Sequence, residues 1–361
     1  MTVRFRESLA GLDAYRPGRS PADVARDLGL PAAVKLASNE SAYGPLPSVL
    51  AVIAAAAAQV NRYPDMAATE LVSTLAGRLH VDADRVAVGC GSVGLYQQLL
   101  AAVAGPGDEV VHAWRSFEVY PVLVRIAGAT AVPVPLRDQT HDLAAMSSAV
   151  TGRTRAVFVC SPNNPTGTVV RAVALEEFLD AVPEDVLVVL DEAYHEFVTD
   201  PEVPDAMALA SERDNVIVLR TMSKAYGLAG LRVGYCVAAP AVVRALRTVQ
   251  LPFCVSSVAQ AAAIASLAAD AELLDRVRTT VAERDRVAGA VRGLGIDVPD
   301  SEANFVWLPL GAASAAFGAG CEERGVIVRP FAGDGVRVTV GAPADNDRFL
   351  AIAAELLTAP D

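Results

Sequence analysis

Short runs of apolar residues recur along the first two-thirds of the chain, and they restrict the possible folds more than any other feature. Several are rich in valine and lack the polar alternation of a strand with one solvated face, which is typical of strands buried on both faces. Helix-like stretches separate the runs, and this alternation predicts an α/β domain with a mostly parallel sheet. The predicted strands cover residues 85–88, 108–111, 129–134, 156–160, 186–190, 216–219 and 232–237.

The texture of the sequence changes near Val242 and divides the chain. Beyond it, stretches rich in Ala, Arg and Glu lead to three more apolar runs, at 304–308, 326–328 and 336–340. At roughly 150 residues per domain, a chain of 361 residues is expected to form two domains. We therefore expect an N-terminal arm at 1–35 that packs with the small domain, a large α/β domain at 36–241 and a smaller α+β domain at 242–361.

Charge and hydropathy exclude several classes of protein. The chain has 30 Lys and Arg against 42 Asp and Glu, a net charge of −12, which disfavours nucleic-acid partners and anionic membranes. Its longest apolar run, at 49–58, has ten residues, whereas a transmembrane helix needs about 20. That run predicts a buried, alanine-rich helix.

The N-terminal segment and the cysteines favour a cytoplasmic protein. The opening residues contain no apolar segment of signal-peptide length. The five cysteines are scattered and odd in number, as expected in a reducing compartment without disulfides. The four histidines show no ligand spacing, so we expect no metal site.

Polar residues gather directly after four of the predicted strands. In open α/β sheets, ligands bind beyond the carboxyl ends of the strands, so a common site would bring these residues together. The four segments are 89–94 (GCGSVG), 161–167 (SPNNPTG), 191–194 (DEAY) and 220–224 (RTMSK). They supply small, amide, acidic and basic groups, which predicts a site for a small molecule.

The glycine-rich segment 89–94 allows three interpretations. The pattern G-x-G-x-x-G after a strand, with Glu109 about 20 residues past Gly89, is typical of dinucleotide binding and would suit an NAD-dependent dehydrogenase. The same glycines also allow a helix N-terminus to approach another anion. A tight turn without any ligand is the third interpretation.

The other three segments have structural alternatives as well. Segment 161–167 can be a rigid turn that serves folding alone, and Asp191 can be a helix N-cap. Lys224 can lie on the surface, but its small and apolar neighbours favour burial, which lowers the pKa of an amine and suits it to Schiff-base chemistry. One cofactor, pyridoxal phosphate, would use all four segments. It needs a lysine, an acid at its ring nitrogen, and donors for its phosphate and ring hydroxyl.

Segment 221–230 (TMSKAYGLAG) resembles the lysine signature of the class II aminotransferases, which are pyridoxal-phosphate-dependent enzymes of fold type I. Segments 161–167 and 191–194 match in the family's order, and further matches are 35–40 (KLASNE), 62–65 (RYPD) and 337–341 (RVTVG). Together they extend from about Tyr15 to Phe349 and resemble the histidinol-phosphate aminotransferase subgroup. The resemblance implies a large domain with a mostly parallel sheet covered by helices, and a smaller α+β domain.

The resemblance also implies roles around the cofactor ring. Lys224 would hold the cofactor covalently and then move the proton between the substrate carbon and the cofactor. Asp191 would pair with the pyridinium nitrogen, while Asn164 and Tyr194 would contact the ring hydroxyl. Phe117 would stack on the ring, although it has a simpler alternative as a core aromatic.

Further roles concern the phosphate, the substrate and a second subunit. Tyr63 would reach the phosphate of the neighbouring subunit in a homodimer with shared active sites, or else be a core aromatic. Arg337 would bind the substrate carboxylate, with Asn39 and Tyr15 nearby, or else be a solvated strand residue. His195 is a weaker candidate for the base, because Lys224 already supplies that role. The residues implied for the phosphate are Gly91, Ser92, Val93, Thr221, Ser223 and Arg232.

Departures from the subgroup pattern bear on the substrate. Segment 89–94 reads GCGSVG where histidinol-phosphate enzymes usually have GNGSDE, and 44–47 reads GPLP. Both variants are similar to the aromatic amino acid (phenylalanine) aminotransferases, and Phe331 in the short segment 329–337 suits an aromatic side chain. We therefore predict amino transfer from an aromatic amino acid to 2-oxoglutarate. Histidinol phosphate is the alternative, because Arg329 suits a phosphate equally well. A non-enzymatic regulator on this fold would be expected to carry an added DNA-binding segment and basic charge, which this chain lacks.

Overall fold

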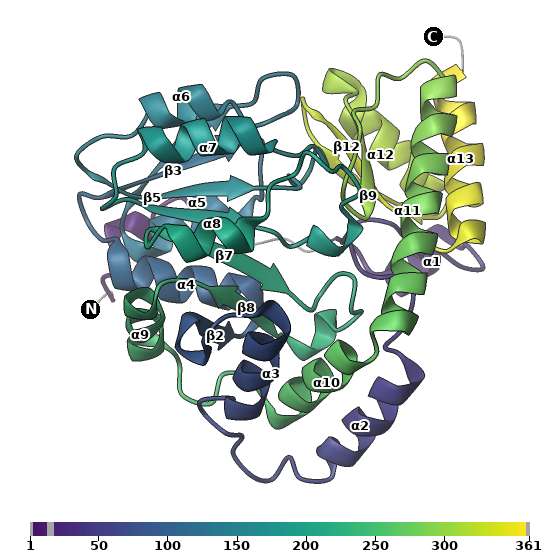
Figure 1. Ribbon diagram of the computed structural model, residues 1–361. Coiled ribbons are helices and arrows are strands. Elements are labelled where there is room, and N and C mark those ends of the chain that lie inside the picture. The colour runs from purple at the N-terminus through teal and green to yellow at the C-terminus, as the bar shows by residue number, and fades with distance from the viewer. Residues whose placement is uncertain (1–2, 13–17, 359–361) are drawn as a thin grey trace.

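A seven-stranded sheet forms the centre of the larger of two lobes (Figure 1). The computed structural model describes residues 3–12 and 18–358. The strand order is β2-β8-β7-β6-β5-β3-β4, and all neighbours are parallel except β8, which runs antiparallel to β2 and β7. The strands are β2 (Val86–Gly89), β3 (Glu109–Trp114), β4 (Thr130–Pro135), β5 (Thr154–Cys160), β6 (Leu187–Asp191), β7 (Val216–Thr221) and β8 (Gly234–Val237). The predicted α/β fold with a mostly parallel sheet is confirmed.

Helices cover both faces of this sheet, which explains the unbroken apolar runs. Along β5, Val157 and Val159 point to one face and pack with α6, α7 and α8, while Phe158 and Cys160 point to the other and pack with α4, α5 and α9. Both faces are therefore dry, as a parallel sheet requires. The helices are α4 (Gly91–Val103), α5 (Val119–Ala127), α6 (Leu143–Ser148), α7 (Ala172–Ala181), α8 (Ala206–Glu212) and α9 (Pro240–Val249).

The smaller lobe is built on a three-stranded antiparallel sheet of order β11-β12-β9. Its strands are β9 (Phe305–Leu308), β11 (Arg329–Phe331) and β12 (Gly335–Thr339), and its helices are α11 (Asp270–Gly293), α12 (Ser314–Glu323) and α13 (Pro343–Thr358). A short parallel pair, β1 (Val34–Lys35) with β10 (Val326–Ile327), brings the N-terminal part of the chain to this lobe. The three apolar runs predicted after Val242 are all strands here.

A third layer of helices lies below the large sheet in Figure 1. It contains α2 (Pro47–Ala57), α3 (Thr69–Leu79) and α10 (Ser257–Ala268). The helix predicted at 49–58 exists as α2, but the prediction that it is buried is wrong, because Val49 is its one buried residue. Within the described residues, no single helix has both the length and the apolar composition of a membrane span, although α10 and α11 meet these criteria together across an 83° bend.

The N-terminal arm contacts both lobes. The short helix η1 (Glu7–Leu9) lies beside α5, where Arg6 Nη2 donates to the carbonyl of Ile126 at 2.8 Å. Farther along, α1 (Pro21–Leu28) packs on the small lobe through Val24 and Ile327. The remaining short helices are η2 (Ala83–Arg85), η3 (His195–Phe197), η4 (Ala229–Leu231) and η5 (Gly311–Ala313).

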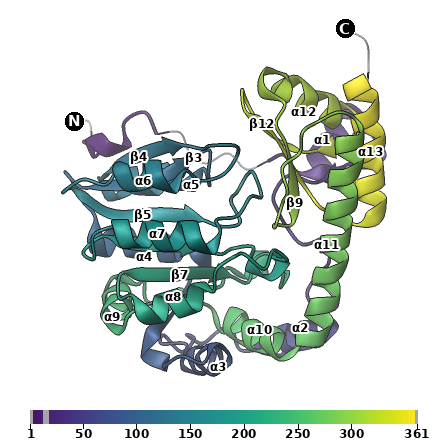
Figure 2. The ribbon, with the colours of Figure 1, turned by 45° about the horizontal axis from the view of Figure 1, so that its top comes forward.

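The boundary that we expect at 241/242 falls before two helices that pack on the large lobe. Helix α9 lies on α4, and α10 lies on α2 and α3. The long helix α11 begins in the core that contains Leu273 and Val277 and ends in the core of the small lobe (Figure 2). We therefore propose that the boundary between the domains lies within α11.

At Gly234, strand β8 lies very close to the start of α4, and a substitution there tests this packing. A Cβ atom at this position would lie 2.8 Å from the backbone nitrogen of Ser92 and 2.9 Å from the carbonyl oxygen of Arg220. We predict that Gly234→Ala destabilises the protein by about 1–3 kcal/mol through overpacking and lowers the midpoint of thermal unfolding. Gly289→Ala in α11 is the matched control. Nothing lies within 4 Å of the methyl group that this control adds. Alanine is more favourable than glycine inside a helix by about 1 kcal/mol, so the control should not lower the midpoint. An unchanged midpoint for Gly234→Ala would contradict the packing described here.

Candidate active site

The carboxyl ends of β5, β6 and β7 open into a cavity of about 260 Å³, which β12 and β11 of the small lobe close from the other side. The four strand-end segments singled out in the sequence therefore meet, as expected from the sheet topology. The predicted site residues that line the cavity are Asn39, Ser92, Val93, Phe117, Asn164, Asp191, Tyr194, Thr221, Ser223, Lys224, Arg232, Arg329 and Arg337.

Lys224 lies on the segment between β7 and η4, and its amine faces the cavity. Its Nζ atom donates to the carbonyl of Ser38 at 3.5 Å and lies 5.8 Å from the centre of the Tyr194 ring. Burial, and then the positive charge of Arg337, lowers the pKa of Lys224 from 10.5 to about 8. A substantial part of this amine is therefore neutral, and nucleophilic, near pH 8.

Asp191 ends β6 with its carboxylate buried. One oxygen, Oδ2, accepts hydrogen bonds from the hydroxyls of Tyr120 at 2.6 Å and Tyr96 at 3.0 Å, and Oδ1 accepts from the backbone N–H of Ala193 at 3.1 Å. Burial raises the pKa of Asp191, while the two tyrosine hydroxyls oppose that shift. A buried carboxylate in this setting favours a cationic partner inside the cavity.

The two tyrosines were not predicted from the sequence. Tyr120 follows Phe117 by three residues at the start of α5, and its ring meets that of Phe117 edge to face at 5.5 Å. Tyr96 lies on the buried face of α4. A signal did exist, since a buried tyrosine needs a partner for its hydroxyl and Asp191 is an acceptor at the adjacent strand end.

The first turn of α4 forms an anion cradle. This helix begins at Gly91 without a side-chain cap, so its first N–H groups remain available as donors. Gly91 has φ +68°, and a Cβ atom there would overlap the guanidinium of Arg232. Arg232 Nη1 also donates to Ser223 Oγ at 3.3 Å, and that hydroxyl accepts from Thr221 Oγ1 at 3.0 Å. The N-terminus of α4, the two hydroxyl groups and the guanidinium of Arg232 thus lie close to one another.

Arg337 joins the small lobe to the large one. Its Nη1 atom donates to Asn164 Oδ1, and Nη2 donates to the carbonyl of Ala37 at 2.6 Å. Asn39 Nδ2 donates in turn to the hydroxyl of Tyr194 at 2.9 Å. The guanidinium that was predicted to bind a substrate carboxylate thus lies against the amide that was predicted to contact the cofactor ring.

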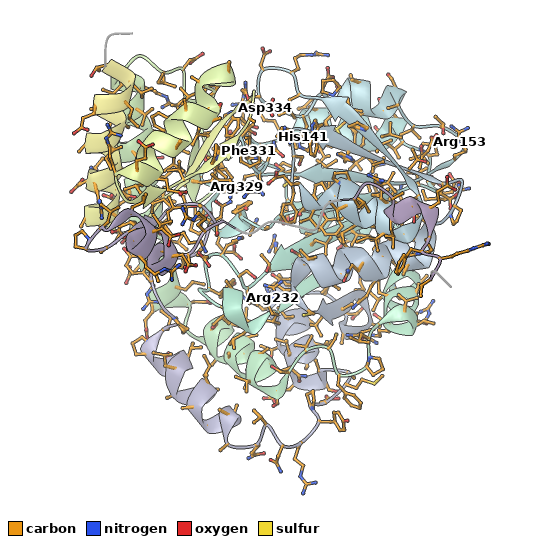
Figure 3. The ribbon with its side chains drawn as sticks, turned by 180° about the vertical axis from the view of Figure 1, so that it is seen from behind. His141, Arg153, Arg232, Arg329, Phe331 and Asp334 are labelled. Atoms are coloured by element: carbon orange, nitrogen blue, oxygen red, sulfur yellow. The ribbon has the colours of Figure 1, made fainter. Side chains whose placement is uncertain are left out.

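Arg329 lies opposite Arg337 in the β11–β12 ladder, and Figure 3 shows it on the side of the small lobe that faces the large one. Its Nη2 atom is 2.9 Å from Oε2 of Glu118. Phe331 is only 5% exposed and packs against Trp307, with the guanidinium carbons of Arg329 and Arg337 each 5.8 Å from its ring centre. Phe331 is not among the residues that line the cavity, so its suitability for an aromatic side chain stays a prediction.

Among the described residues, two of the predicted site residues, Tyr63 and Gly91, do not line this cavity. Tyr63 is 82% exposed and its ring stacks on Phe253 at 4.6 Å, so it is not the core aromatic of the alternative prediction. Gly91 lies behind Arg232, and Tyr15 is outside the described residues. His195 Nδ1 is 3.7 Å from Glu192 Oε2, away from the cavity wall.

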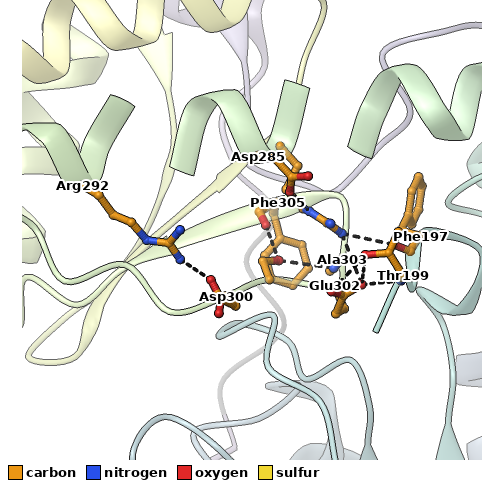
Figure 4. A network of polar contacts seen from close by, with 10 residues as sticks. Phe197, Thr199, Asp285, Arg292, Asp300, Glu302, Ala303 and Phe305 are labelled. Atoms are coloured by element: carbon orange, nitrogen blue, oxygen red, sulfur yellow. Dashed lines mark hydrogen bonds and ion pairs between the residues drawn. The ribbon is translucent and has the colours of Figure 1, made fainter. Parts of the chain in front are cut away.

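A larger groove, of about 1060 Å³, separates the lobes elsewhere. Figure 4 shows part of its wall, where Arg292 pairs with Asp300 at 2.5 Å and Glu302 accepts from Thr199. Its arginines lie against carboxylates and it contains no lysine. The smaller cavity, by contrast, is lined by Lys224 and by the buried carboxylate of Asp191.

The donor set of the smaller cavity fits pyridoxal phosphate. Lys224 offers an amine of lowered pKa, Asp191 offers a buried carboxylate, and the first turn of α4 with Arg232 offers an anion cradle. These are the groups that an aldehyde, a protonated ring nitrogen and a phosphate need. Among the described residues, no group of three or more His, Cys, Asp or Glu could hold a metal ion.

The chain resembles aminotransferases over nearly all of its length. The family model described as aminotransferase class I and II matches residues 31–352. A relative from Thermobifida fusca (strain YX), named aromatic amino acid aminotransferase, is 60% identical over 97% of this chain and 96% of its own length. One of the same name from Streptomyces coelicolor is 56% identical over 98% and 97%. A solved histidinol-phosphate aminotransferase from Sinorhizobium meliloti, in complex with pyridoxal-5'-phosphate, has a TM-score of 0.89 at 30% identity, over 99% of this chain and 98% of that one.

The charges around Lys224 predict the direction in which its pKa shifts when each charge is removed. Arg337 lowers the pKa of Lys224 and Glu40 raises it. In cofactor-free protein, Arg337→Gln should therefore move the titration midpoint of Lys224 to higher pH, and Glu40→Gln to lower pH. The measurement is the rate of acetylation of Lys224 against pH, followed by mass spectrometry, with an added lysine-containing peptide as the reference, because Lys35 pairs with Glu40 at 3.1 Å. Shifts of the same sign in both variants would refute this electrostatic account.

Proposed function

The chain belongs to the class I and II aminotransferases, and we propose that it transfers the amino group of an aromatic amino acid to 2-oxoglutarate with pyridoxal phosphate as cofactor. The observation that carries this proposal is the convergence of Lys224, Asp191 and Arg337 on one cavity at the carboxyl edge of the sheet. An amine, a buried carboxylate and a buried guanidinium are what the cofactor and an amino acid substrate together require.

The residues of the cavity divide into those that orient and those that react. The first turn of α4 and Arg232 bind the cofactor phosphate, while Phe117 packs on the ring. Asp191, held by Tyr96 and Tyr120, keeps a proton on the ring nitrogen. The cofactor, when bound, supplies an electron sink for negative charge at the substrate Cα.

Lys224 moves the proton in this scheme. Its Nζ atom, whose pKa is lowered to about 8 by burial and by Arg337, would take the proton from the substrate Cα and release it again inside the cavity. Arg337 would hold the substrate carboxylate and so fix the direction in which that Cα–H bond points. The aromatic 2-oxo acid would then leave, and 2-oxoglutarate would enter the same cavity and be converted to glutamate by the reverse sequence.

The choice of an aromatic substrate rests on the relatives. Two of them, at 60% and 56% identity over nearly the whole chain, are named aromatic amino acid aminotransferases. The structural neighbour that is named for histidinol phosphate has 30% identity. Histidinol phosphate remains the alternative substrate that an assay must include.

A homodimer with shared sites is part of the proposal. Tyr63 is 82% exposed, and its stacking on Phe253 holds the ring outward from the chain. Other large apolar residues that are exposed are Leu50 on α2, Val60 and Met66, which lie three residues before and after Tyr63 in the sequence, and Leu251, two residues before Phe253. We propose that they form one surface with Tyr63, since exposed apolar residues that gather in a patch mark an interaction site. A second copy of the chain would cover this surface and receive Tyr63 at its cofactor phosphate.

The cellular setting that we propose is a reducing cytoplasm. All five cysteines are free, as thiols are in such a compartment. The net charge of −12 also supports small-molecule substrates over a nucleic-acid partner.

Replacement of the lysine tests the reaction. The sequence contains two lysines, Lys35 and Lys224, so Lys35→Ala is a matched control that also removes one amine. Lys224→Ala should lower the turnover of phenylalanine with 2-oxoglutarate by at least about 1,000-fold, because it removes both the attachment point and the base. Borohydride reduction should add the mass of one phosphopyridoxyl group to the wild type and to Lys35→Ala but none to Lys224→Ala. Faster wild-type turnover of histidinol phosphate than of phenylalanine would overturn the substrate assignment.

Mixed dimers test the shared site. Tyr63→Ala should lose most activity through weaker hold on the cofactor phosphate, and Lys224→Ala should be inactive. After subunit exchange, a mixed dimer has one site with Lys224 from one chain and Tyr63 from the other, so activity should exceed the sum of the two separate preparations. A strictly additive mixture, or a sedimentation mass equal to one chain of 37.5 kDa, would count against the homodimer.

A further inference from the structure

A carboxylate that the proposed reaction does not use lies in the cavity wall. Glu118, the residue before α5, and Arg329, the first residue of β11, both line the cavity, and they come from opposite lobes. Their side chains are 34% and 23% exposed, and Oε2 of Glu118 lies 2.9 Å from Nη2 of Arg329. The pair is therefore reachable from the cavity and is not buried behind it.

Glu118 sets the charge that the small lobe presents to a substrate. Arg329 and Arg337 are direct partners in the antiparallel β11–β12 ladder, so their side chains leave the same face of the sheet. Alone, the two guanidinium groups would offer two adjacent positive charges. With Glu118 paired to Arg329, a carboxylate offsets one of these two positive charges.

This charge suits one class of substrate and disfavours another. Each carboxylate of an amino acid or of 2-oxoglutarate carries one negative charge, and Arg337 balances the one next to the reacting carbon. A phosphate monoester carries nearly two at neutral pH, and a phosphate that reached both arginines would lie within a few ångströms of the Glu118 carboxylate. Like charges at such a separation repel, and the effect is strongest where water is partly excluded.

We propose that Glu118 is a specificity-determining residue that disfavours substrates with a phosphate monoester group at the Arg329 end of the cavity, away from the cofactor phosphate, by neutralising Arg329. The inference rests on the proposed function, since it concerns which amine donors reach the same site. It also explains how Arg329, an arginine well suited to phosphate, can lie in a cavity for aromatic amino acids. Repulsion by the Glu118 carboxylate, and not the lack of a cation, distinguishes phosphate substrates from carboxylate substrates.

A purely structural role for the pair is the competing explanation, and the molecule contains a control for it. Arg115 and Asp334 form a second ion pair between the lobes, with Nη2 2.6 Å from Oδ2, and neither residue lines the cavity. Figure 3 shows Asp334 close to Phe331 and Arg329 on the small lobe. Asp334→Asn thus weakens the contact between the lobes and leaves the charge inside the cavity unchanged.

The experiment compares substrate preference in the holoenzyme. For the wild type, Glu118→Gln, Glu118→Asp and Asp334→Asn, kcat/KM is measured with phenylalanine and with histidinol phosphate, each with 2-oxoglutarate. Glu118→Gln should raise the ratio for histidinol phosphate over phenylalanine at least tenfold, and Glu118→Asp, which keeps the charge, should restore most of the exclusion. Asp334→Asn should leave the ratio within twofold of the wild type.

Inhibition by inorganic phosphate provides a second measurement that does not depend on turnover of a new substrate. Phosphate should compete with phenylalanine at least tenfold more strongly in Glu118→Gln than in the wild type, and the difference should shrink as salt screens the charge. An unchanged ratio and unchanged inhibition in Glu118→Gln, or an equal change in Asp334→Asn, would overturn the role of Glu118. Wild-type protein that fails to transaminate phenylalanine would instead overturn the proposed function, so the two failures are distinct.

Discussion

The buried guanidinium of Arg337 is the contact on which the arrangement of the site depends. It belongs to the small lobe, yet it donates hydrogen bonds to Asn164 on the large lobe and to the carbonyl of Ala37 on the segment after β1. A buried cation that lost these acceptors would be strongly destabilising, so the two lobes are held in the relation that supplies them. The same charge adds to the effect of burial in lowering the pKa of Lys224. One side chain therefore contributes both to the closure of the cavity and to the lowered pKa of its amine.

The fold could be predicted because the strands of the large sheet have a distinctive local composition. Strands buried on both faces must be apolar throughout, and the valine-rich runs in the sequence correspond to β2–β8. The later apolar runs correspond to β9, β10 and β12, whereas β11 was not predicted as a strand. The convergence of residues such as Asp191 and Lys224 was predictable for a topological reason. Parallel strands end at the same edge, so polar residues after each strand become neighbours.

What the sequence did not reveal depends on packing between distant segments. Tyr96 and Tyr120 reach Asp191 only because α4 and α5 lie side by side on one face of the sheet. Glu118 meets Arg329 across 211 positions of sequence. The exposure of α2 was also missed, because composition alone cannot tell a helix packed in a core from one with an apolar face open to another chain. These features require the relative placement of whole elements, which no local pattern encodes.

Helix α11 has a mechanical consequence for the cavity. Its 24 residues form a rod of about 36 Å. Leu273 and Val277 anchor one end in the core beneath the large sheet, and Val287 and Val291 anchor the other in the core of the small lobe. Because each end moves with the core in which it is packed, the helix can act as a lever. A tilt of about 5° at its base moves the far end by about 3 Å. The strands β11 and β12 belong to the same lobe as that far end. A small change in packing at the base of α11 would therefore produce a larger displacement of Arg329 and Arg337 relative to the amine of Lys224.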